Sequence, residues 1–288
     1  PKGFTKNYIL KGNAKDLEKK IKSSYNRASK GKDFMVIEGT GHAGVGSVFD
    51  LSNASVAKLL GAKVIIVTCA GIGRPIDEVM LNKAVFDSLG VEVLGVVVNK
   101  VIPEKYETID KYVRLGFKRK GIDVLGVIPF FPALSSPTMR QLFEDIKGEL
   151  ICGENNLNQS VSKVIVGAMP AHTALDYFKG DVLLITPGNR EDLIITAITC
   201  NFPDFHDYNV KGIILTCGVM PNKTILKLVR ETNIPIILVN YDTFTIAQKI
   251  TNLIIKIRPK DSDKIDKVKE IIKEYVDVKY IIDKLHCT

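Results

Sequence analysis

The chain has 288 residues, of which 45% are hydrophobic and 25% charged, and its 40 Lys and Arg against 32 Asp and Glu give a formal net charge of +8. This composition excludes a disordered or fibrous protein, and the length favours two domains. No apolar run approaches the ~20 residues of a membrane helix, no signal peptide is evident, and the five cysteines form no C-x-x-C pair, so we expect a soluble, cytoplasmic protein with reduced thiols and no membrane partner.

The first half alternates apolar runs of strand length with segments of helical periodicity, which is the pattern of βα units wound on a parallel sheet. The predicted strands are Phe34–Glu38, Val64–Thr68, Val93–Asn99 and Val124–Ile128. The predicted helices are Lys15–Lys30, Asn53–Leu60, Ile76–Leu89, Tyr106–Arg119 and Met139–Ile146. Prolines and a polar segment after these elements predict a domain boundary near residue 150.

The second half restarts the alternation and contains an internal repeat. The predicted strands are Val164–Gly167, Val182–Thr186, Gly212–Thr216 and Pro235–Val239. Gly167-Ala-Met-Pro170 recurs as Gly218-Val-Met-Pro221, 51 residues later, so we expect two equivalent turns at one sheet edge. The last segment, Asp261–Leu285, has apolar residues at helical spacing and predicts one amphipathic helix that packs on its own chain or on a partner.

A glycine-rich loop follows the first predicted strand and is the most informative motif. The strand Phe34–Glu38 brings a carboxylate to its end, and Gly39-Thr-Gly41 follows at the edge where doubly wound sheets bind ligands. A carboxylate there can hold Mg²⁺, and glycines let backbone amides approach phosphates. A plain βα connection with Glu38 in a local role explains the same residues. Gly39, Gly41 and Gly44 also form a weak dinucleotide motif, but the next strand ends without the acidic residue that a nicotinamide site requires.

Three other positions could bind a ligand, each with a structural alternative. Asn99 ends a predicted strand and could read a nucleobase edge, or simply form a turn. Arg190 lies at a predicted helix start, where an anion would be favoured, although Asn189 and Asp192 can also cap that helix. Asp242 has the features of an N-cap. No basic run interleaved with aromatics occurs, so a solvated surface accounts for the net charge and we expect no nucleic-acid partner.

Taken in order, these motifs resemble a known family. Glu38-Gly-Thr-Gly-His, Ser52-Asn-Ala54, Gly71-Ile-Gly73, Gly95-Val-Val-Val-Asn99 and Leu125-Gly-Val-Ile-Pro129 resemble the dethiobiotin synthetase and cobyrinic acid diamide synthase group of P-loop NTPases. The variant that is most similar is found in the N-terminal part of long bacterial phosphate acetyltransferases and in stand-alone homologues, where a DRTGG domain follows it. Val166-Gly-Ala-Met169, Ile185-Thr-Pro-Gly-Asn-Arg190, Ile214-Leu-Thr-Cys-Gly218 and Asp242-Thr243 look like that second domain, without the DRTGG string itself.

The resemblance and the patterns above together give a fold class, three segments and two candidate binding sites. The fold class is an α/β protein with two mainly parallel sheets; the resemblance implies residues 1–150 as the NTPase-like domain and 151–258 as a regulatory DRTGG-like domain, and the helical spacing adds 259–288 as the terminal helix. The resemblance also implies an ATP and Mg²⁺ site in which Glu38 would associate with the metal and Asn99 with the base. The nucleotide-binding candidates are Glu38, Gly39, Thr40, Gly41, Asn99 and Lys100. The second-domain candidates, for a small anionic ligand, are Gly188, Asn189, Arg190, Thr216, Asp242 and Thr243.

One departure from the family divides the functional hypotheses. The family carries a P-loop well upstream of E-G-T-G, but no G-x-x-x-x-G-K-[ST] occurs here, and Pro1 in place of Met suggests that an upstream segment lies outside this chain. The first hypothesis is an ATP-binding protein, with ligase or ATPase activity if a P-loop is supplied; phosphate acetyltransferase activity itself is not expected of this chain. The alternative is a non-catalytic, anion-sensing regulatory module, and a dinucleotide oxidoreductase is a minor third. Either of the first two could form a homodimer through Asp261–Leu285.

Overall fold

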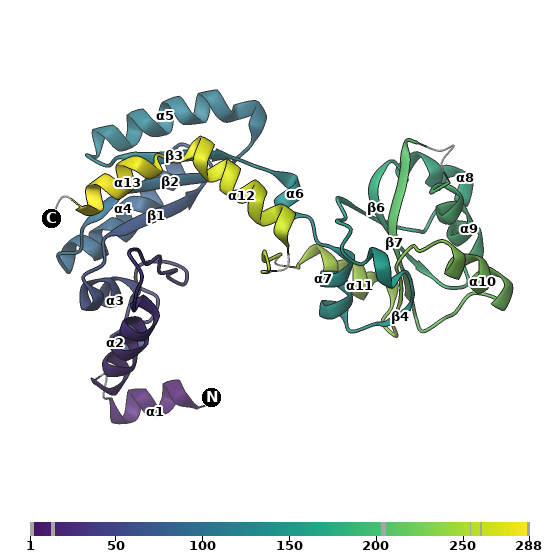
Figure 1. The fold of residues 1–288 in the computed structure, drawn as a ribbon, viewed down its shortest axis with the longest axis horizontal. Helices are drawn as coiled ribbons and strands as arrows, with labels where there is room; N and C mark the ends of the chain where they lie inside the picture. The colour runs from purple at the N-terminus through teal and green to yellow at the C-terminus, as the bar shows by residue number, and fades with distance from the viewer. Residues whose placement is uncertain (1–2, 13–14, 203–205, 254, 260, 287–288) are drawn as a thin grey trace. The chain divides into compact units, whose positions relative to one another are not determined.

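The computed structural model describes residues 3–12, 15–202, 206–253, 255–259 and 261–286 (Figure 1). Its contacts divide the chain into two compact units, one running to Phe130 and resuming at Asp266, the other spanning Phe131–Ile265. Each unit is an α/β structure with its own sheet, as predicted. No helix among the described residues is long and apolar enough to cross a membrane.

The sheet of the first unit has three parallel strands in the order β1-β2-β3. They are β1 (Val64–Cys69), β2 (Val93–Val101) and β3 (Val124–Pro129), close to the predicted bounds. The helices and 3₁₀ turns before the crossing into the second unit are α1 (Phe4–Lys11), α2 (Lys15–Ser29), η1 (Ser47–Phe49), α3 (Asn53–Leu60), α4 (Gly73–Ser88), η2 (Pro103–Lys105) and α5 (Tyr106–Arg119). The central strand β2 is the most buried because it has a neighbour on both sides, and α4 and α5 pack on one face through Val79, Val113 and Phe117.

The prediction of a strand at Phe34–Glu38 is wrong. This segment is extended, but it pairs with no described strand, and Phe34 and Val36 are 50% and 83% exposed. The apolar residues have the right propensity, but a strand forms only where a neighbour satisfies its backbone groups. As a consequence, β1 is an edge strand and Glu38 lies in a loop rather than at a strand end.

The prediction of a single terminal helix is also wrong, because two helices form. These are α12 (Ser262–Tyr275) and α13 (Val278–His286), and the link between them lies against the outer edge of β3. Val276 bridges to Gly126, and the amide of Asp277 donates to the carbonyl of Leu125 at 2.8 Å. A Cβ on Gly126 would lie 2.5 Å from the carbonyl oxygen of Tyr275, so this approach requires glycine. The link thereby covers the edge that β3 would otherwise expose.

The second unit has a five-stranded sheet in the order β4-β8-β7-β6-β5. The four predicted strands are present as β5 (Lys163–Val166), β6 (Gly180–Pro187), β7 (Tyr208–Thr216) and β8 (Ile236–Leu238), all parallel. The short strand β4 (Glu149–Cys152) was not predicted and pairs antiparallel with β8. Because β4 belongs to this sheet, the two units separate between Phe130 and Phe131 rather than near residue 150.

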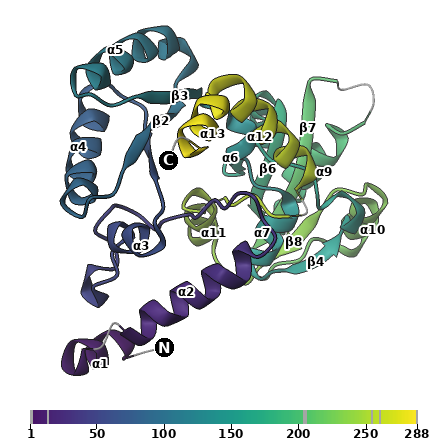
Figure 2. The same ribbon diagram turned by 60° about the vertical axis from the view of Figure 1, so that its left-hand side comes forward.

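Helices cover both faces of this sheet (Figure 2). The helices and 3₁₀ turns of this unit are α6 (Pro132–Ser135), α7 (Met139–Ile146), η3 (Glu154–Asn156), α8 (Ala171–Ala174), η4 (Leu175–Tyr177), α9 (Glu191–Thr199), α10 (Lys223–Glu231) and α11 (Thr243–Thr251). Alternate residues along β6 enter opposite cores: Leu184 packs with α9, whereas Leu183 and Ile185 pack with α7 and α11. This alternation explains why β6 reads as a continuous apolar run, since both of its faces are buried.

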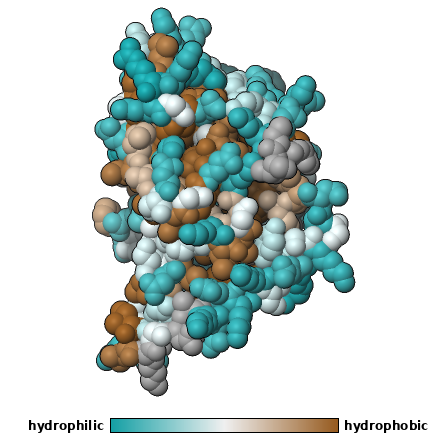
Figure 3. Space-filling view, turned by 90° about the vertical axis from the view of Figure 1, so that its left-hand side faces the viewer, coloured by the Kyte–Doolittle hydropathy of each residue, from teal (hydrophilic) through white to brown (hydrophobic). Residues whose placement is uncertain are grey.

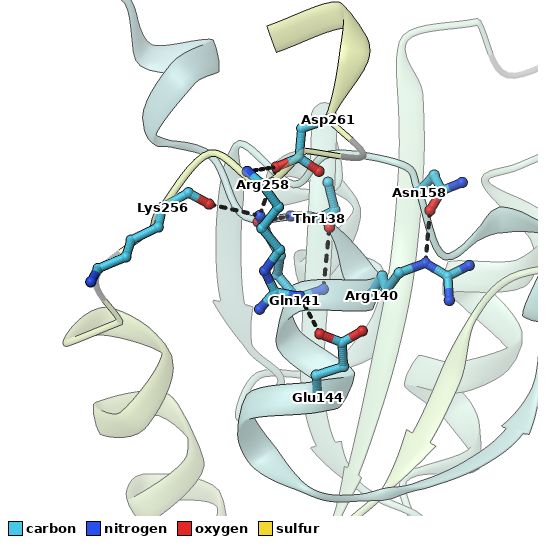
Figure 4. A network of polar contacts seen from close by, with 8 residues as sticks. All are labelled: Thr138, Arg140, Gln141, Glu144, Asn158, Lys256, Arg258 and Asp261. Carbon is cyan, nitrogen blue, oxygen red and sulfur yellow. Dashed lines mark hydrogen bonds and ion pairs between the residues drawn. The ribbon is translucent and has the colours of Figure 1, made fainter. Parts of the chain in front are cut away.

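A polar network fixes the segment before α12 to α7 (Figure 4). Thr138 and Gln141 form a capping box at the start of α7. The Nε2 atom of Gln141 also donates to the carbonyl of Lys256 at 3.2 Å and to Oδ2 of Asp261 at 3.1 Å. The guanidinium of Arg258 pairs with Glu144. One side chain therefore caps a helix and holds a distant segment at the same time.

Candidate functional site

The carboxyl ends of four parallel strands meet at one edge of the second unit. Because β5 to β8 run in the same direction, the turns that follow them are neighbours, including both G-x-M-P turns of the repeat. The amide of Cys217 donates to the carbonyl of Tyr241 at 2.8 Å, and that of Gly218 to the carbonyl of Val239 at 2.9 Å. A Cβ on Gly188 would lie 1.9 Å from the carbonyl oxygen of Val219, so the turns after β6 and β7 are in direct contact.

Arg190 ties the turn after β6 to the turn after β5. Its Nη1 and Nη2 atoms donate to the carbonyls of Gly167 and Met169 at 3.2 and 2.8 Å, and its Nε and Nη2 atoms pair with Asp192 at 3.0 and 2.9 Å. The hydrogen-bonded guanidinium lowers the pKa of the Asp192 carboxyl. The predicted capping by Asn189 does not occur: Arg190 occupies the N-cap position of α9 and no side chain caps it. Asn189 is exposed at the edge.

Hydroxyl groups and a capping carboxylate complete this edge. Thr216 and Thr243 lie 2.8 Å apart through their Oγ1 atoms. Asp242 caps α11, as predicted, because its Oδ1 accepts from the amide of Thr245 at 2.9 Å and its Oδ2 from the Thr245 hydroxyl at 2.6 Å. These bonds lower the pKa of Asp242. The structure thus brings all six predicted second-domain candidates to one edge.

Thr186 at the end of β6 was not singled out from the sequence. Its hydroxyl is buried and has no hydrogen-bond partner in the described part of the chain. Native structures rarely leave a buried polar group unsatisfied. The sequence does contain a pattern that could have identified Thr186. Thr186-Pro-Gly188 matches Thr216-Cys-Gly218, so each of two neighbouring strands has a threonine two residues before a glycine.

The glycine-rich loop of the first unit is held by Asn53 at the start of α3. The Nδ2 atom of Asn53 donates to the carbonyls of Thr40 and His42 at 2.9 and 2.8 Å. A Cβ on Gly39 would lie 3.2 Å from the Asn53 amide, and Gly41 has a φ of 68°, so both glycines have a backbone reason to be there. The loop is therefore ordered, with Glu38 exposed beside it.

Asn99 and Lys100 lie in an irregular part of β2. The amide of Lys100, at a φ of 61°, donates to Oδ1 of Asn99 at 2.8 Å, which stabilises this irregular backbone. No hydrogen bond or ion pair among the described residues joins Glu38 to Asn99. The described residues also hold no group of three His, Cys, Asp or Glu that could bind a metal. A single exposed carboxylate such as Glu38 is still compatible with Mg²⁺, which takes one or two carboxylates beside phosphate and water ligands.

Comparisons with known proteins agree with the two-domain organisation. A family model described as an AAA domain matches residues 8–138, and one described as a DRTGG domain matches residues 141–253. These matches confirm the order predicted from the sequence, an NTPase-like domain followed by a DRTGG domain.

The sequence is similar to the phosphate acetyltransferases of several bacteria. That of Nitratidesulfovibrio vulgaris is 26% identical over 278 residues, which cover 93% of this chain and 39% of the relative. That of Pseudomonas putida is 25% identical over 285 residues, covering 94% and 40%, and that of Escherichia coli is 22% identical over 303 residues, covering 95% and 42%. The chain therefore spans about two fifths of the length of these relatives.

One solved structure is also similar. It contains the CBS and DRTGG domains of the regulatory region of Clostridium perfringens pyrophosphatase with the activator diadenosine tetraphosphate. The match has a TM-score of 0.35 and 15% sequence identity, and covers 61% of this chain and 85% of that one.

Proposed function

Because the chain joins an AAA domain to a DRTGG domain, we propose that it is a ligand-binding regulatory protein that takes up ATP and Mg²⁺ in the first domain and a small anionic molecule in the second. The observation that carries this proposal is the edge of the second unit, where hydrogen bonds and close backbone contacts join the turns after β5 to β8. The helices α9, α10 and α11 begin at this edge. Helix N-termini present unpaired amides and a partial positive charge, which favour an anion.

Some residues at this edge stabilise the turns, and others are exposed and can contact a ligand. Arg190 and Asp242 are engaged by the backbone and by Asp192 or Thr245, so their role is to fix the turns. The exposed Asn189 remains for the ligand, whereas the amide of Arg190 already donates to the carbonyl of Pro187 at 3.0 Å. The melting temperature of the full chain, measured in the presence of inorganic phosphate, acetate or pyrophosphate, tests whether this edge binds a small anion. Asn189→Ala should abolish the stabilisation, and Asn155→Ala, at an exposed position away from the edge, should preserve it.

In the first domain, the proposed nucleotide site uses the ordered glycine loop. Glu38 would hold Mg²⁺, Gly39, Thr40 and Gly41 would face the phosphates, and Asn99 and Lys100 would lie beside the base. Bound Mg²⁺ would neutralise phosphate charge. The chain's own contribution is the loop held by Asn53 and an exposed carboxylate at its start.

Calorimetric titration of the full chain with ATP and Mg²⁺ tests the nucleotide site. We expect binding without turnover, and Glu38→Gln should weaken it by about tenfold, equivalent to about 1.4 kcal/mol. Glu104→Gln, at an exposed position in the same unit, is the matched control. ATP hydrolysis that disappears in Glu38→Gln would replace this proposal with an ATP-dependent enzyme, and binding of NAD instead of ATP would favour the dinucleotide alternative.

The same proposal includes a cytoplasmic location and a homodimer. Ile271 of α12 is buried against its own unit, whereas Ile272, Val278 and Ile282 of the two terminal helices stay 36–40% exposed. A second copy could cover these three side chains about a twofold axis. Light scattering should give twice the chain mass, and a monomer at micromolar concentration would contradict it.

A further inference from the structure

A cavity lies at the amino ends of β7 and β8, the end of these strands opposite to the candidate edge. Its volume is about 360 Å³, at the small end of the range for ligand pockets, which suits one ring system with its substituents. Its polar lining includes Asn156, Gln159, Asn201, His206, Asn209 and Lys211. Buried apolar residues, among them Cys200, Val210 and Ile234, also line it.

The backbone around this cavity is held in place without any ligand. The amide of Gln159 donates to the carbonyl of Asn156 at 3.2 Å, and the carbonyl of Gln159 accepts from the amide of Met139 at 3.0 Å. Asn201 pairs with the backbone of Val210 in both directions, at 2.7 and 2.8 Å. A ligand would therefore meet a preorganised wall, which lowers the entropic cost of binding.

Several side-chain amides that line the cavity keep hydrogen-bonding atoms available for a ligand. The side-chain amide of Gln159 has no partner in the part of the chain that the structure describes, so it offers a donor and an acceptor side by side. Asn156 donates from Nδ2 to the carbonyl of Asn233 at 2.9 Å, and Asn209 from Nδ2 to Asp181 at 2.9 Å, so both keep Oδ1 as an acceptor. The cavity thus combines one donor and acceptor pair with further acceptors.

Charge and shape narrow the ligand further. Nζ of Lys211 lies 3.5 Å from Oδ1 of Asp181, and this ion pair offsets the positive charge of the lysine. The site therefore has no strong preference for a phosphate. Phe202 is 55% exposed and presents a ring where a planar ligand could stack. The ligand that fits this lining best is an uncharged, planar ring that carries both hydrogen-bond donors and acceptors on one edge.

We propose that this cavity binds the base of a nucleoside, with the Gln159 amide paired to the base edge and Phe202 against its face. A glutamine amide can form two hydrogen bonds to a base edge at once. The site is separate from the ATP site proposed in the first domain and from the carboxyl edge of the second.

Calorimetric titration of the full chain with adenosine, guanosine, cytidine and uridine, and with glucose as a non-planar comparison, tests the proposal. At least one nucleoside should bind, and Gln159→Leu should weaken it by about tenfold or more, because the amide pair is lost. Asn155→Leu, which changes a nearby exposed amide, should leave the affinity unchanged. Absence of nucleoside binding, equal binding of glucose, or an unchanged affinity in Gln159→Leu would each overturn the proposal.

Two further variants separate this site from folding effects and from the ATP site. Phe202→Ala alters an exposed ring and should weaken the nucleoside while the melting temperature stays unchanged. Asn99→Ala should leave nucleoside binding intact whatever it does to ATP. Loss of nucleoside binding in Asn99→Ala would place the ligand in the first unit and overturn the proposal, whereas failure of ATP to bind would contradict only the function proposed for the AAA domain.

Discussion

Gly188 is the residue for which the structure gives the sharpest steric demand. The added Cβ of Gly188→Ala would lie 1.9 Å from the backbone oxygen of Val219, and a backbone cannot move aside as a flexible side chain can. We expect the unfolding free energy of the second unit to fall by about 2 kcal/mol or more in urea denaturation. Gly73→Ala, where nothing lies within 4 Å, should cause no loss, and equal stability of both variants would contradict the observed contact between turns.

Lys264 gives a second prediction at this scale, through pH. Its ammonium is buried and donates to the carbonyl of Ser136, and burial lowers the pKa of Lys264, although Asp261 partly opposes this. The folded chain therefore binds fewer protons at this position than the unfolded chain does between the two pKa values. Its unfolding free energy should rise as the pH increases toward about 10.4, the value for an unperturbed lysine.

The comparison with Lys264→Met isolates this effect from the other lysines. The difference in unfolding free energy between the two proteins should shift in favour of the natural chain as the pH rises from 7 to 10. A difference that stays constant over this range would contradict the lowered pKa.

The sequence predicted which residues gather at the second unit's edge better than it predicted their contacts. Asp242 caps its helix as expected, because a cap depends on residues only three positions away. Arg190 was considered as an anion ligand, but its partners Gly167 and Met169 lie 21 to 23 residues away and are fixed by the sheet. The unsatisfied hydroxyl of Thr186 is likewise a property of burial, which a single sequence does not specify.

At the scale of elements, Gln141 at the start of α7 joins this helix to the segment before α12, and two variants can separate these roles. Thr138→Ala removes the cap and should cost about 1 kcal/mol of unfolding free energy. Gln141→Ala removes the reciprocal capping bond and also the bonds to Lys256 and Asp261. Only Gln141→Ala should therefore speed hydrogen exchange at residues 255–259, and faster exchange there in both variants would show that the cap alone holds this segment.

Elements with local signals were predicted closely. The predicted Asn53–Leu60, Tyr106–Arg119 and Met139–Ile146 coincide with α3, α5 and α7, since periodicity and caps such as Ser52 are local. Phe34–Glu38 has the composition of a strand, but no described strand pairs with it. The break after Tyr275 depends on the edge of β3, which lies about 150 residues earlier in the chain.

At the scale of the whole molecule, the division of the chain is not contiguous. The first unit is completed by α13 and most of α12, which return to it after the second unit has ended at Ile265. A boundary read along the sequence assumes that each domain is one segment, so this return could not be predicted from composition. The order of the two domains was predicted correctly because each carries its own motifs.

The first unit also has an open sheet edge, which leads to a prediction about association. The run Phe34–Ile37, which pairs with no described strand, is extended and largely exposed, with Val36 at 83%. Apolar surface is visible among hydrophilic side chains on the face drawn in Figure 3. Open edges and exposed apolar runs promote strand pairing between molecules.

Val36→Lys should therefore reduce concentration-dependent association without loss of stability, because a charge on an exposed strand-forming run blocks pairing and no buried contact is removed. Light scattering at increasing protein concentration measures the first effect, and thermal unfolding measures the second. Leu81→Lys is the matched control, since Leu81 is 74% exposed but lies on the helix α4, where no strand can add. If both variants reduce association equally, general surface hydrophobicity rather than the extended run is its cause.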